Sequence, residues 1–242
     1  TTLKIVVDAL FQSTVEDETE QIYAALDELG NILGQQSGNP LLAIVPDWAP
    51  LPLMSRKRRA SATLDGIVYR FIHERRASNV DKGDLLSMLM LVEDEDGERM
   101  NDQQLRDEAM TIFIAGHETT ALTLTWAFVL LAQHREVEAK LYAEVDKALN
   151  GRLPTLGDLP NLPYTEMIIK ETLRLYPPAW LLLRQALVEL PLGSYRVPKG
   201  NQIWICPYTM NRHPRFYDKP EAFQPERFGM DETGRDLESR LP

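Results

Sequence analysis

Apolar residues recur at intervals of three and four over most of the first 175 positions, the spacing of one face of an amphipathic helix. Prolines, glycines and polar clusters interrupt this pattern and divide it into separate helices. A loop rich in proline is expected over 34–52. The expected helices are the end of one over 1–13, a second that starts at Ser13 or Thr14 and ends near Leu33, and others over 56–76, 82–92, 103–133, 135–149 and 164–175.

After residue 178 the pattern changes to short stretches rich in apolar residues. They predict strands over 181–188, 194–197 and 202–206, which would form one small sheet spanning 181–206. Prolines interrupt residues 207–242, so this segment is expected to be mostly irregular coil. The predicted fold class is therefore mainly α with a small β-sheet, and residues 1–242 are expected to belong to a single domain.

The helix expected over 103–133 contains a polar interruption. Its flanks are rich in Ile, Phe, Leu, Val and Ala, but its middle reads Ala115-Gly116-His117-Glu118-Thr119-Thr120. A glycine inside a helix costs about 1 kcal/mol relative to alanine, and threonine is also a poor helix former. A carboxylate removed from water without partners costs far more, or takes up a proton. Such a conflict inside an otherwise consistent helix indicates a functional site.

Helical spacing places Gly116, Thr119, Thr120 and Thr123 on one face of this helix. Their small size would let a flat ligand lie close to the backbone. The hydroxyls of Thr119 and Thr120 could bond either to the carbonyls of Ala115 and Gly116 or to that ligand. Ionisable residues at the centre argue against a membrane span, and Ala121 stands where a zinc-protease helix needs its second histidine. A buried structural helix with a satisfied polar pair stays open.

The charge balance and the single cysteine narrow the class of protein. The 26 basic and 36 acidic residues give a formal net charge of −10, which disfavours nucleic acid as a partner. One cysteine excludes an internal disulfide and fits a reducing compartment. There is no signal peptide and no second apolar run that could span a membrane, so a soluble, cytoplasmic protein is expected. The chain begins at Thr1 without a methionine and stops at Pro242 after a polar loop, so we expect a fragment.

Two charged segments stand in the C-terminal half. Glu171 and Arg174 share one face of the helix expected over 164–175. Such a pair alone is weak evidence for a buried cluster, because most pairs of this kind are exposed and contribute only about 0–1 kcal/mol to stability. Pro225-Glu226-Arg227-Phe228 follows in the expected coil, where Arg227 could fold back onto Glu171. A buried cluster of this kind needs nearly complete hydrogen bonding.

Taken in order, Ala115–Thr120, Glu171–Arg174 and Phe223–Phe228 resemble the motifs of the cytochrome P450 family of haem-thiolate monooxygenases. The resemblance covers the whole chain, from the middle of the family's helical domain to just short of its haem-binding loop. It implies a partial cytochrome P450 fold and a haem b enzyme that inserts one oxygen atom from O2 into a lipophilic substrate. It also implies a separate reductase or ferredoxin as electron donor, since the chain has no flavin or nucleotide motif.

The resemblance assigns roles to individual residues of the long helix and the first strand. Thr119 would be the alcohol that hydrogen-bonds dioxygen at the iron, and Glu118 the acid that feeds protons toward it. Ala115 and Gly116 would form a widened groove beside the haem. Arg184 would pair with a haem propionate, with an ordinary exposed strand arginine as the alternative.

The resemblance also assigns structural roles and leaves some residues open. Glu171, Arg174 and Arg227 would form the family's buried triad, needed for folding and haem incorporation rather than for chemistry. Residues 179–183 and 41–53 would line or roof the substrate pocket, with core packing as the alternative for each residue. The substrate itself, the particular redox partner and the oligomeric state are not predicted.

No metal ligand is expected within the chain, because the family's axial cysteine follows the segment 223–228 and would lie beyond Pro242. Cys206 precedes that segment on an expected strand, and we interpret it as a small core residue. His213 is undecided between a polar group near the haem edge and a turn residue. Two other classes stay open: a haem-free relative that acts as a binding or regulatory protein, and a helical membrane or scaffold protein.

Overall fold

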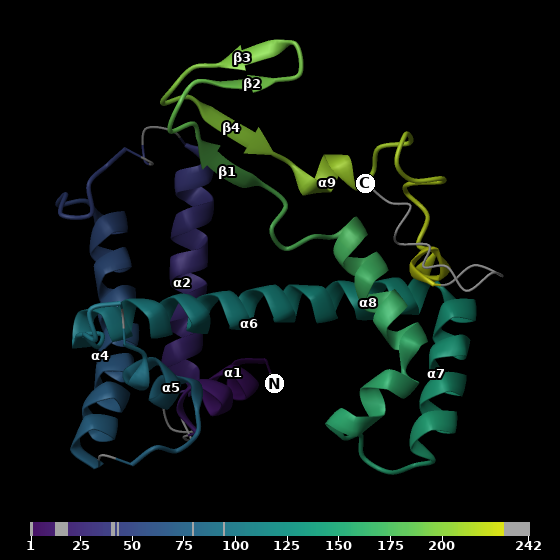
Figure 1. Cartoon of the computed structure of the whole chain (residues 1–242), viewed down its shortest axis with the longest axis horizontal. Helices are drawn as coiled ribbons and strands as arrows, with labels where there is room; N and C mark the ends of the chain where they lie inside the picture. The colour runs from purple at the N-terminus through teal and green to yellow at the C-terminus, as the bar shows by residue number, and fades with distance from the viewer. Residues whose placement is uncertain are drawn as a thin grey trace. The chain divides into compact units, whose positions relative to one another are not determined.

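The computed structural model of the chain describes residues 2–12, 19–39, 42, 44–78, 80–93 and 95–229. It is mainly helical, with short strands in its C-terminal part (Figure 1). The helices are α1 (Thr2–Phe11), α2 (Thr19–Gly38), α4 (Pro52–Ser78), α5 (Leu85–Leu91), α6 (Asp102–Gln133), α7 (Arg135–Leu149), α8 (Pro163–Leu175) and α9 (Pro207–Met210), with the 3₁₀ helices η2 (Leu156–Asn161) and η3 (Pro225–Phe228).

The backbone divides into two compact units, Thr1–Glu118 and Thr119–Pro242, with the boundary inside α6. We refer to them as the N-terminal and C-terminal units. The assignment of the whole chain to one domain therefore stays a prediction. Among the helices in the described part of the chain, none combines the length and the apolarity that crossing a membrane requires.

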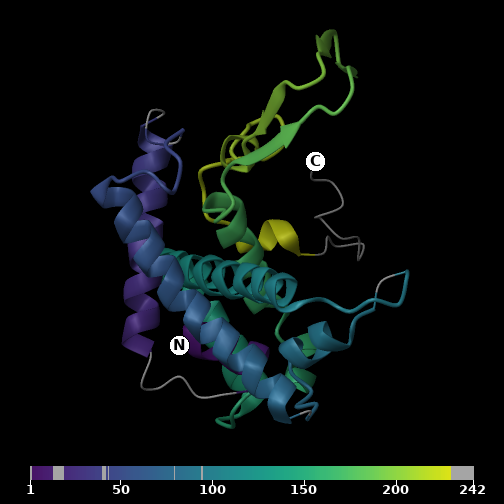
Figure 2. The ribbon, with the colours of Figure 1, turned by 90° about the vertical axis from the view of Figure 1, so that its left-hand side faces the viewer.

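The N-terminal unit is built around one apolar cluster. α2 and α4 pack side by side, as both ribbon views show (Figure 1, Figure 2). Buried side chains from α1, α2, α4, α5 and the start of α6 make up the cluster, among them Leu10, Ile22 and Leu105. Phe11 and Phe71 stack within it at a centroid distance of 4.4 Å. Each fully buried large apolar side chain contributes about 1.5–3 kcal/mol, so this cluster stabilises the unit.

A reciprocal cap fixes the start of α6. The side chain of Asn101 accepts a hydrogen bond from the N–H of Gln104 at 2.9 Å, and the side chain of Gln104 accepts one from the N–H of Asn101 at 2.9 Å. The capping box supplies acceptors for N–H groups that a helix start leaves without partners. Asn101 is therefore the N-cap of α6.

One glycine and one proline explain why the end of α2 and the start of α4 differ from the predicted bounds. α2 does not end near Leu33 but continues through Gly34 to Gly38, because a single helical glycine costs only about 1 kcal/mol. α4 begins at Pro52, before the basic run over 56–59, because proline fits the first turn of a helix. The expected caps of α2, Ser13 and Thr14, lie outside the described residues.

α5 is shorter than the helix predicted over 82–92. The side chain of Asp84 accepts a hydrogen bond from the N–H of Ser87 at 2.9 Å and so starts the helix at Leu85. Gly83, with φ 69°, supplies the left-handed backbone just before this cap.

α7 and α8 share a second apolar cluster with the end of α6. α7 has the predicted bounds, because Asn150 adopts the left-handed conformation, with φ 49°, that ends a helix. Glu144 of α7 accepts hydrogen bonds from the N–H groups of Tyr164 at 2.6 Å and Thr165 at 2.9 Å. A side chain of one helix thus caps the start of the other.

In the described part of the chain, the strands form two antiparallel ladders rather than the single sheet predicted over 181–206. β1 (Leu182–Gln185) pairs with β4 (Gln202–Ile205), and β2 (Leu190–Leu192) pairs with β3 (Tyr195–Val197). Gly193, with φ 59°, occupies the turn between β2 and β3. The stretch predicted as one strand over 181–188 therefore ends at Gln185, and the chain then enters a separate hairpin.

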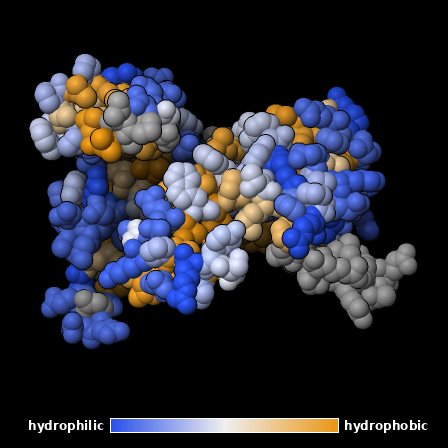
Figure 3. Space-filling view, turned by 90° about the horizontal axis from the view of Figure 1, so that it is seen from above, coloured by the Kyte–Doolittle hydropathy of each residue, from blue (hydrophilic) through white to orange (hydrophobic). Residues whose placement is uncertain are grey.

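Apolar residues are also visible at the molecular surface, as orange areas among the hydrophilic ones (Figure 3). The exposed large apolar residues include Leu122, Phe128 and Val129 in the second half of α6, and Leu173 in α8. The first half of α6 contributes buried side chains such as Ala109 and Phe113 to the N-terminal cluster. The two halves of this helix therefore differ in how fully the described residues cover their apolar side chains.

Candidate active site on α6 and a buried ion cluster

The polar interruption predicted from the sequence lies near the middle of α6, and most of its side chains are accessible. Ala115 and Thr119 are one helical turn apart on the same face, and both are exposed. Glu118 and Thr120 are exposed as well.

Gly116 differs from its neighbours because a second helix packs on it. A Cβ atom at this position would lie 3.2 Å from Cγ2 of Val6 in α1, which is tighter than ordinary contact. Glycine therefore permits the close approach of α1 to α6 within the N-terminal unit. This packing accounts for the glycine without a cofactor, and the assignment of Gly116 to a haem groove stays a prediction.

Thr123 and Thr125, which follow the polar interruption, donate hydrogen bonds to the backbone of α6. The hydroxyl of Thr123 donates to the carbonyl of Thr119 at 2.8 Å, and that of Thr125 donates to the carbonyl of Ala121 at 2.8 Å. Such bonds satisfy the hydroxyl and tend to bend a helix.

His117 contacts α2. Its ring meets the ring of Tyr23 edge-on at a centroid distance of 5.6 Å. Burial lowers the pKa of His117 below its ordinary value of 6.5, and the carboxylate of Glu118 offsets part of this effect. The imidazole is therefore mainly neutral at pH 7. His117 has no predicted role from the sequence.

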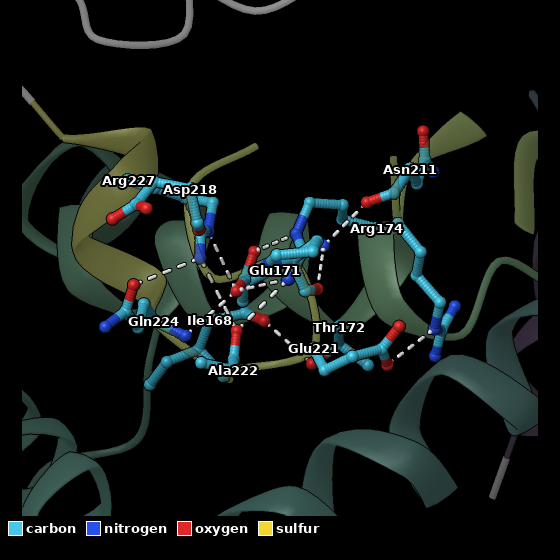
Figure 4. A network of polar contacts seen from close by, with 12 residues as sticks. Ile168, Glu171, Thr172, Arg174, Asn211, Asp218, Glu221, Ala222, Gln224 and Arg227 are labelled. Atoms are coloured by element: carbon cyan, nitrogen blue, oxygen red, sulfur yellow. Dashed lines mark hydrogen bonds and ion pairs between the residues drawn. The ribbon is translucent and has the colours of Figure 1, made fainter. Parts of the chain in front are cut away.

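A second polar site is the buried ion cluster on α8 (Figure 4). Glu171 and Arg174 are 0% and 3% exposed, and Arg174 binds the carboxylate through Nε at 2.6 Å and Nη2 at 2.9 Å. Nε of Arg227, from η3, reaches the same carboxylate at 3.0 Å, and the N–H of Gln224 donates to it at 2.8 Å. The structure thus brings together three charged residues from two distant segments.

The cluster also holds the irregular chain that follows α9. Nη1 of Arg174 donates to the carbonyls of Asn211 and Pro220, both at 2.7 Å. Nη2 of the same residue donates to the carbonyl of Ala222 at 3.1 Å. These bonds supply the nearly complete hydrogen bonding that buried charges require. Arg174 therefore holds three backbone carbonyls of a described segment that is neither helix nor strand.

Arg184 lies in β1, opposite Ile203 of β4, and its side chain is exposed. Its Nη1 donates to the carbonyl of Leu183 at 2.8 Å. Within the described residues the guanidinium makes no ion pair, so it can accept a carboxylate as a partner. Its pairing with a haem propionate stays a prediction.

Cys206 and His213 flank the short helix α9. Cys206 is half-buried at the start of α9, and hydrogen bonding by Thr209 lowers the pKa of its thiol below the ordinary value. Nδ1 of His213 accepts the N–H of Arg215 at 3.1 Å within a turn. The described residues contain no group of three or more His, Cys, Asp or Glu side chains arranged to hold a metal ion.

A buried ion pair in the N-terminal unit is not predicted from the sequence. Arg75 of α4 donates two hydrogen bonds of 2.6 Å to the carboxylate of Asp84, and it also donates to the hydroxyl of Ser87. A further bond of 3.2 Å reaches the carbonyl of Phe11, the last residue of α1. Asp84 stands directly before an apolar run, which is a signal for a helix cap, but nothing in the sequence identifies Arg75 as its partner.

Comparison with known proteins identifies the family. The sequence model described as "Cytochrome P450" matches residues 1–241. The chain belongs to the cytochrome P450 family. This P450 chain is 44% identical to cyclooctat-9-en-7-ol 5-monooxygenase of Streptomyces melanosporofaciens over 74% of the chain and 39% of that protein. It is 38% identical to pentalenene oxygenase of Streptomyces avermitilis over 96% of the chain and 51% of that protein. The chain thus spans about half or less of the length of these relatives.

Solved structures confirm the predicted fold class, mainly α with short strands in a partial P450 fold. The heme domain of cytochrome P450DA matches with a TM-score of 0.84 and 27% identity, over 99% of this chain and 52% of that one. Retinoic acid bound cyanobacterial CYP120A1 matches with a TM-score of 0.83 over 100% of this chain and 55% of that one. At 24% identity, the second likeness shows the fold alone.

The P450 family implies a haem cofactor, and the described residues fit one. The exposed face with Ala115 and Thr119 would admit a flat macrocycle against α6. The exposed guanidinium of Arg184, which makes no ion pair with the residues that the structure describes, suits a carboxylate of the cofactor. Cys206 directly precedes Pro207, which starts α9, and the Thr209 hydroxyl donates to its backbone carbonyl at 3.0 Å.

Proposed function

We propose that this chain is part of a longer protein, a haem-dependent monooxygenase that inserts one oxygen atom from O2 into a lipophilic substrate. The observation that carries the proposal is the family match over residues 1–241, which contains the accessible Ala115 and Thr119 face. The names of two relatives support an apolar substrate, since they specify the alkenol cyclooctat-9-en-7-ol and pentalenene. The electrons would come from a separate reductase or ferredoxin.

The residues of α6 would bind the oxygen substrate and control its protons. Thr119 would hold a hydrogen bond to the reacting oxygen with its hydroxyl, and Glu118 would deliver protons to the same point. Ala115, one turn before Thr119, would leave space for the cofactor. When bound, haem b held by a cysteine thiolate supplies the electron density that favours O–O cleavage. We place that cysteine beyond Pro242.

The buried cluster of Glu171, Arg174 and Arg227 would support this site without taking part in the chemistry. Its role would be to fix the chain between α9 and η3, which a haem-binding segment would follow. The exposed guanidinium of Arg184 would bind a propionate of the cofactor.

The experiment is a carbon monoxide difference spectrum of the reduced full-length protein. A haem held by a thiolate is expected to give a Soret band at clearly longer wavelength than one held by histidine. Cys206→Ser is the matched control and is expected to leave the band unchanged. A folded protein that takes up no haem would overturn the proposed function and favour a binding or regulatory role. Loss of the band in Cys206→Ser would instead show that the wrong cysteine has been assigned.

A further inference from the structure

A cavity of about 460 Å³ opens beside His117 in the N-terminal unit. It lies between α2, the start of α4 and α6, and apolar residues such as Leu26, Leu29 and Ile114 form much of its wall. Its titratable lining consists of Tyr23 and Asp27 from α2, Lys57 from α4, and His117 and Glu118 from α6. The function proposed above uses only Glu118 of this set.

Helix geometry places Glu118 between this cavity and the face that carries Thr119. At about 100° per residue, Glu118 is about 60° from Ala115 around the helix axis, on the side toward His117. Thr119 is about 40° from Ala115 on the other side, and His117 is about 160° away. A cofactor on the Ala115 and Thr119 face would therefore leave the His117 side of Glu118 uncovered.

Gly30 lies on the α2 side of the cavity. It lines the cavity from the interior of α2, and a Cβ atom there would meet nothing within 4 Å. A helical glycine costs about 1 kcal/mol relative to alanine, and no close neighbour requires one at this position. The space beside Gly30 can hold water, because the cavity is far larger than the roughly 30 Å³ of one water molecule and has several polar walls.

His117 is the group in the cavity lining whose ordinary pKa lies nearest to neutrality. The charge of Lys57 is offset by Asp47, whose carboxylate is 2.7 Å from the ammonium. Asp27 accepts a hydrogen bond from the side chain of Asn31 at 3.1 Å. Tyr23 packs on the imidazole and is itself 41% exposed, so the half-buried ring lies next to solvent. An imidazole placed in this way can exchange protons with cavity water near pH 7.

We propose that this cavity is the solvent side of the proton supply to Glu118, and that His117 passes protons from cavity water to that carboxylate. The inference rests on the proposed function, because Glu118 needs a supply of protons only if O2 is consumed at the Thr119 face. In each transfer the imidazolium gives one ring N–H proton to the carboxylate through a water molecule. The neutral imidazole then takes a proton from cavity water, which exchanges with bulk solvent.

The main test uses three variants of the full-length, haem-loaded protein. Gly30→Leu adds a bulky apolar side chain at the cavity wall without changing a charge, and His117→Asn removes the titrating ring. Gly34→Leu is the matched control, since it lies one turn further along α2, has open space for a Cβ and does not line the cavity. The product formed per electron consumed is expected to fall about tenfold in the first two, and to stay unchanged in Gly34→Leu.

Two readouts separate a proton carrier from a structural residue. Turnover driven by hydrogen peroxide, which brings its own protons, is expected to persist in Gly30→Leu and His117→Asn. In the wild-type protein, the product formed per electron is expected to fall as the pH rises through the pKa of His117, which lies below 6.5. This pH dependence is expected to disappear in His117→Asn. Equal losses with O2 and with peroxide would show a structural role and overturn the proposal.

A labelling experiment tests the cavity without any turnover. His117→Cys is expected to react with a water-soluble thiosulfonate, identified at that position by peptide mass. Adding Gly30→Leu should slow the reaction, whereas adding Gly34→Leu should not. An unreactive cysteine at position 117, or equal rates in the two double variants, would contradict the inference.

The outcomes also separate this inference from the function on which it rests. If the unchanged protein takes up no haem and forms no product, the proposed function fails and the proton route fails with it. If the unchanged protein is active but Gly30→Leu behaves like Gly34→Leu, the proton route is wrong and the proposed function stands.

Discussion

The two units each contain a buried arginine–carboxylate cluster, and the clusters differ in what they hold together. In the N-terminal unit, Arg75 and Asp84 join α4 to the start of α5 and to the end of α1, elements that already share an apolar cluster. In the C-terminal unit, Glu171 and Arg174 hold the irregular segment after α9, whose described residues form no strand pairing. The first cluster adds to packing, whereas the second takes the place of secondary structure.

The two clusters also differ in charge. Arg75 and Asp84 form a one-to-one pair, but Glu171 is shared by two arginines, Arg174 and Arg227. Removing either carboxylate leaves a buried guanidinium without a counter-charge, and removing Glu171 leaves two. Breaking one buried pair costs about 3–5 kcal/mol, so the cluster on α8 should be the more sensitive.

The largest effect is expected for Glu171→Ala. Two guanidiniums left without a counter-charge should lower the free energy of unfolding by more than about 5 kcal/mol, which equals the whole stability of many domains. The full-length protein is then expected to yield no soluble, haem-loaded material, and Arg174→Ala should behave in the same way. Glu166→Ala, at an exposed position of α8, is the control and should fold normally. A soluble, haem-loaded Glu171→Ala protein would contradict the comparison.

A smaller loss is expected for Asp84→Ala. It should cost about 3 kcal/mol, because Arg75 loses its counter-charge and α5 loses its cap while the apolar cluster remains. Urea unfolding of the full-length protein measures the loss. Glu74→Ala, an exposed position on α4, should change the free energy of unfolding by less than about 0.5 kcal/mol. Equal losses for Asp84→Ala and Glu74→Ala would show that the N-terminal pair contributes nothing.

The ion pair of Asp84 and Arg75 should also make the stability of the protein depend on pH. Burial alone would raise the pKa of Asp84, but hydrogen bonds from Arg75 and Ser87 outweigh it and hold that pKa below its ordinary value of 3.8. The ionised carboxylate therefore stabilises the fold above pH 3.8, and this contribution is lost as the pH falls through the lowered pKa.

Asp84→Asn provides the measurement. The difference in unfolding free energy between the unchanged protein and Asp84→Asn should be constant at neutral pH. Below the ordinary carboxyl pKa it should shrink by at most about 1.4 kcal/mol per pH unit. A difference that grows as the pH falls would mean that the folded protein raises this pKa instead.

The same comparison shows what the sequence can and cannot predict. The bounds of α7 follow from local signals, because Asn150 and Gly151 end the helix wherever it packs. The cluster of Glu171, Arg174 and Arg227 was expected from resemblance to a family. The spacing of Glu171 and Arg174 alone would have been weak evidence for it.

Contacts that depend on tertiary structure were not predicted. Nothing local connects Arg75 to Asp84, or Glu144 to the start of α8, because each pair meets only after the helices have packed. The single sheet expected over 181–206 divided into two ladders for a related reason, since short strands choose partners by packing and turn geometry. Gly116 was expected to make room for a ligand, and its contact with Val6 was not foreseen.

The smallest effect on stability, and the most direct test of the central claim, is expected for Thr119→Ala. The residue is exposed and alanine is the better helix former, so the free energy of unfolding should change by less than about 0.5 kcal/mol. Thr125→Ala is the control, because Thr125 is another exposed threonine of α6, and its hydroxyl donates to the carbonyl of Ala121. The decisive quantity is product formed per electron consumed by the haem-loaded, full-length protein. The account predicts a fall of about tenfold in Thr119→Ala with haem content unchanged. An unchanged yield per electron would contradict it.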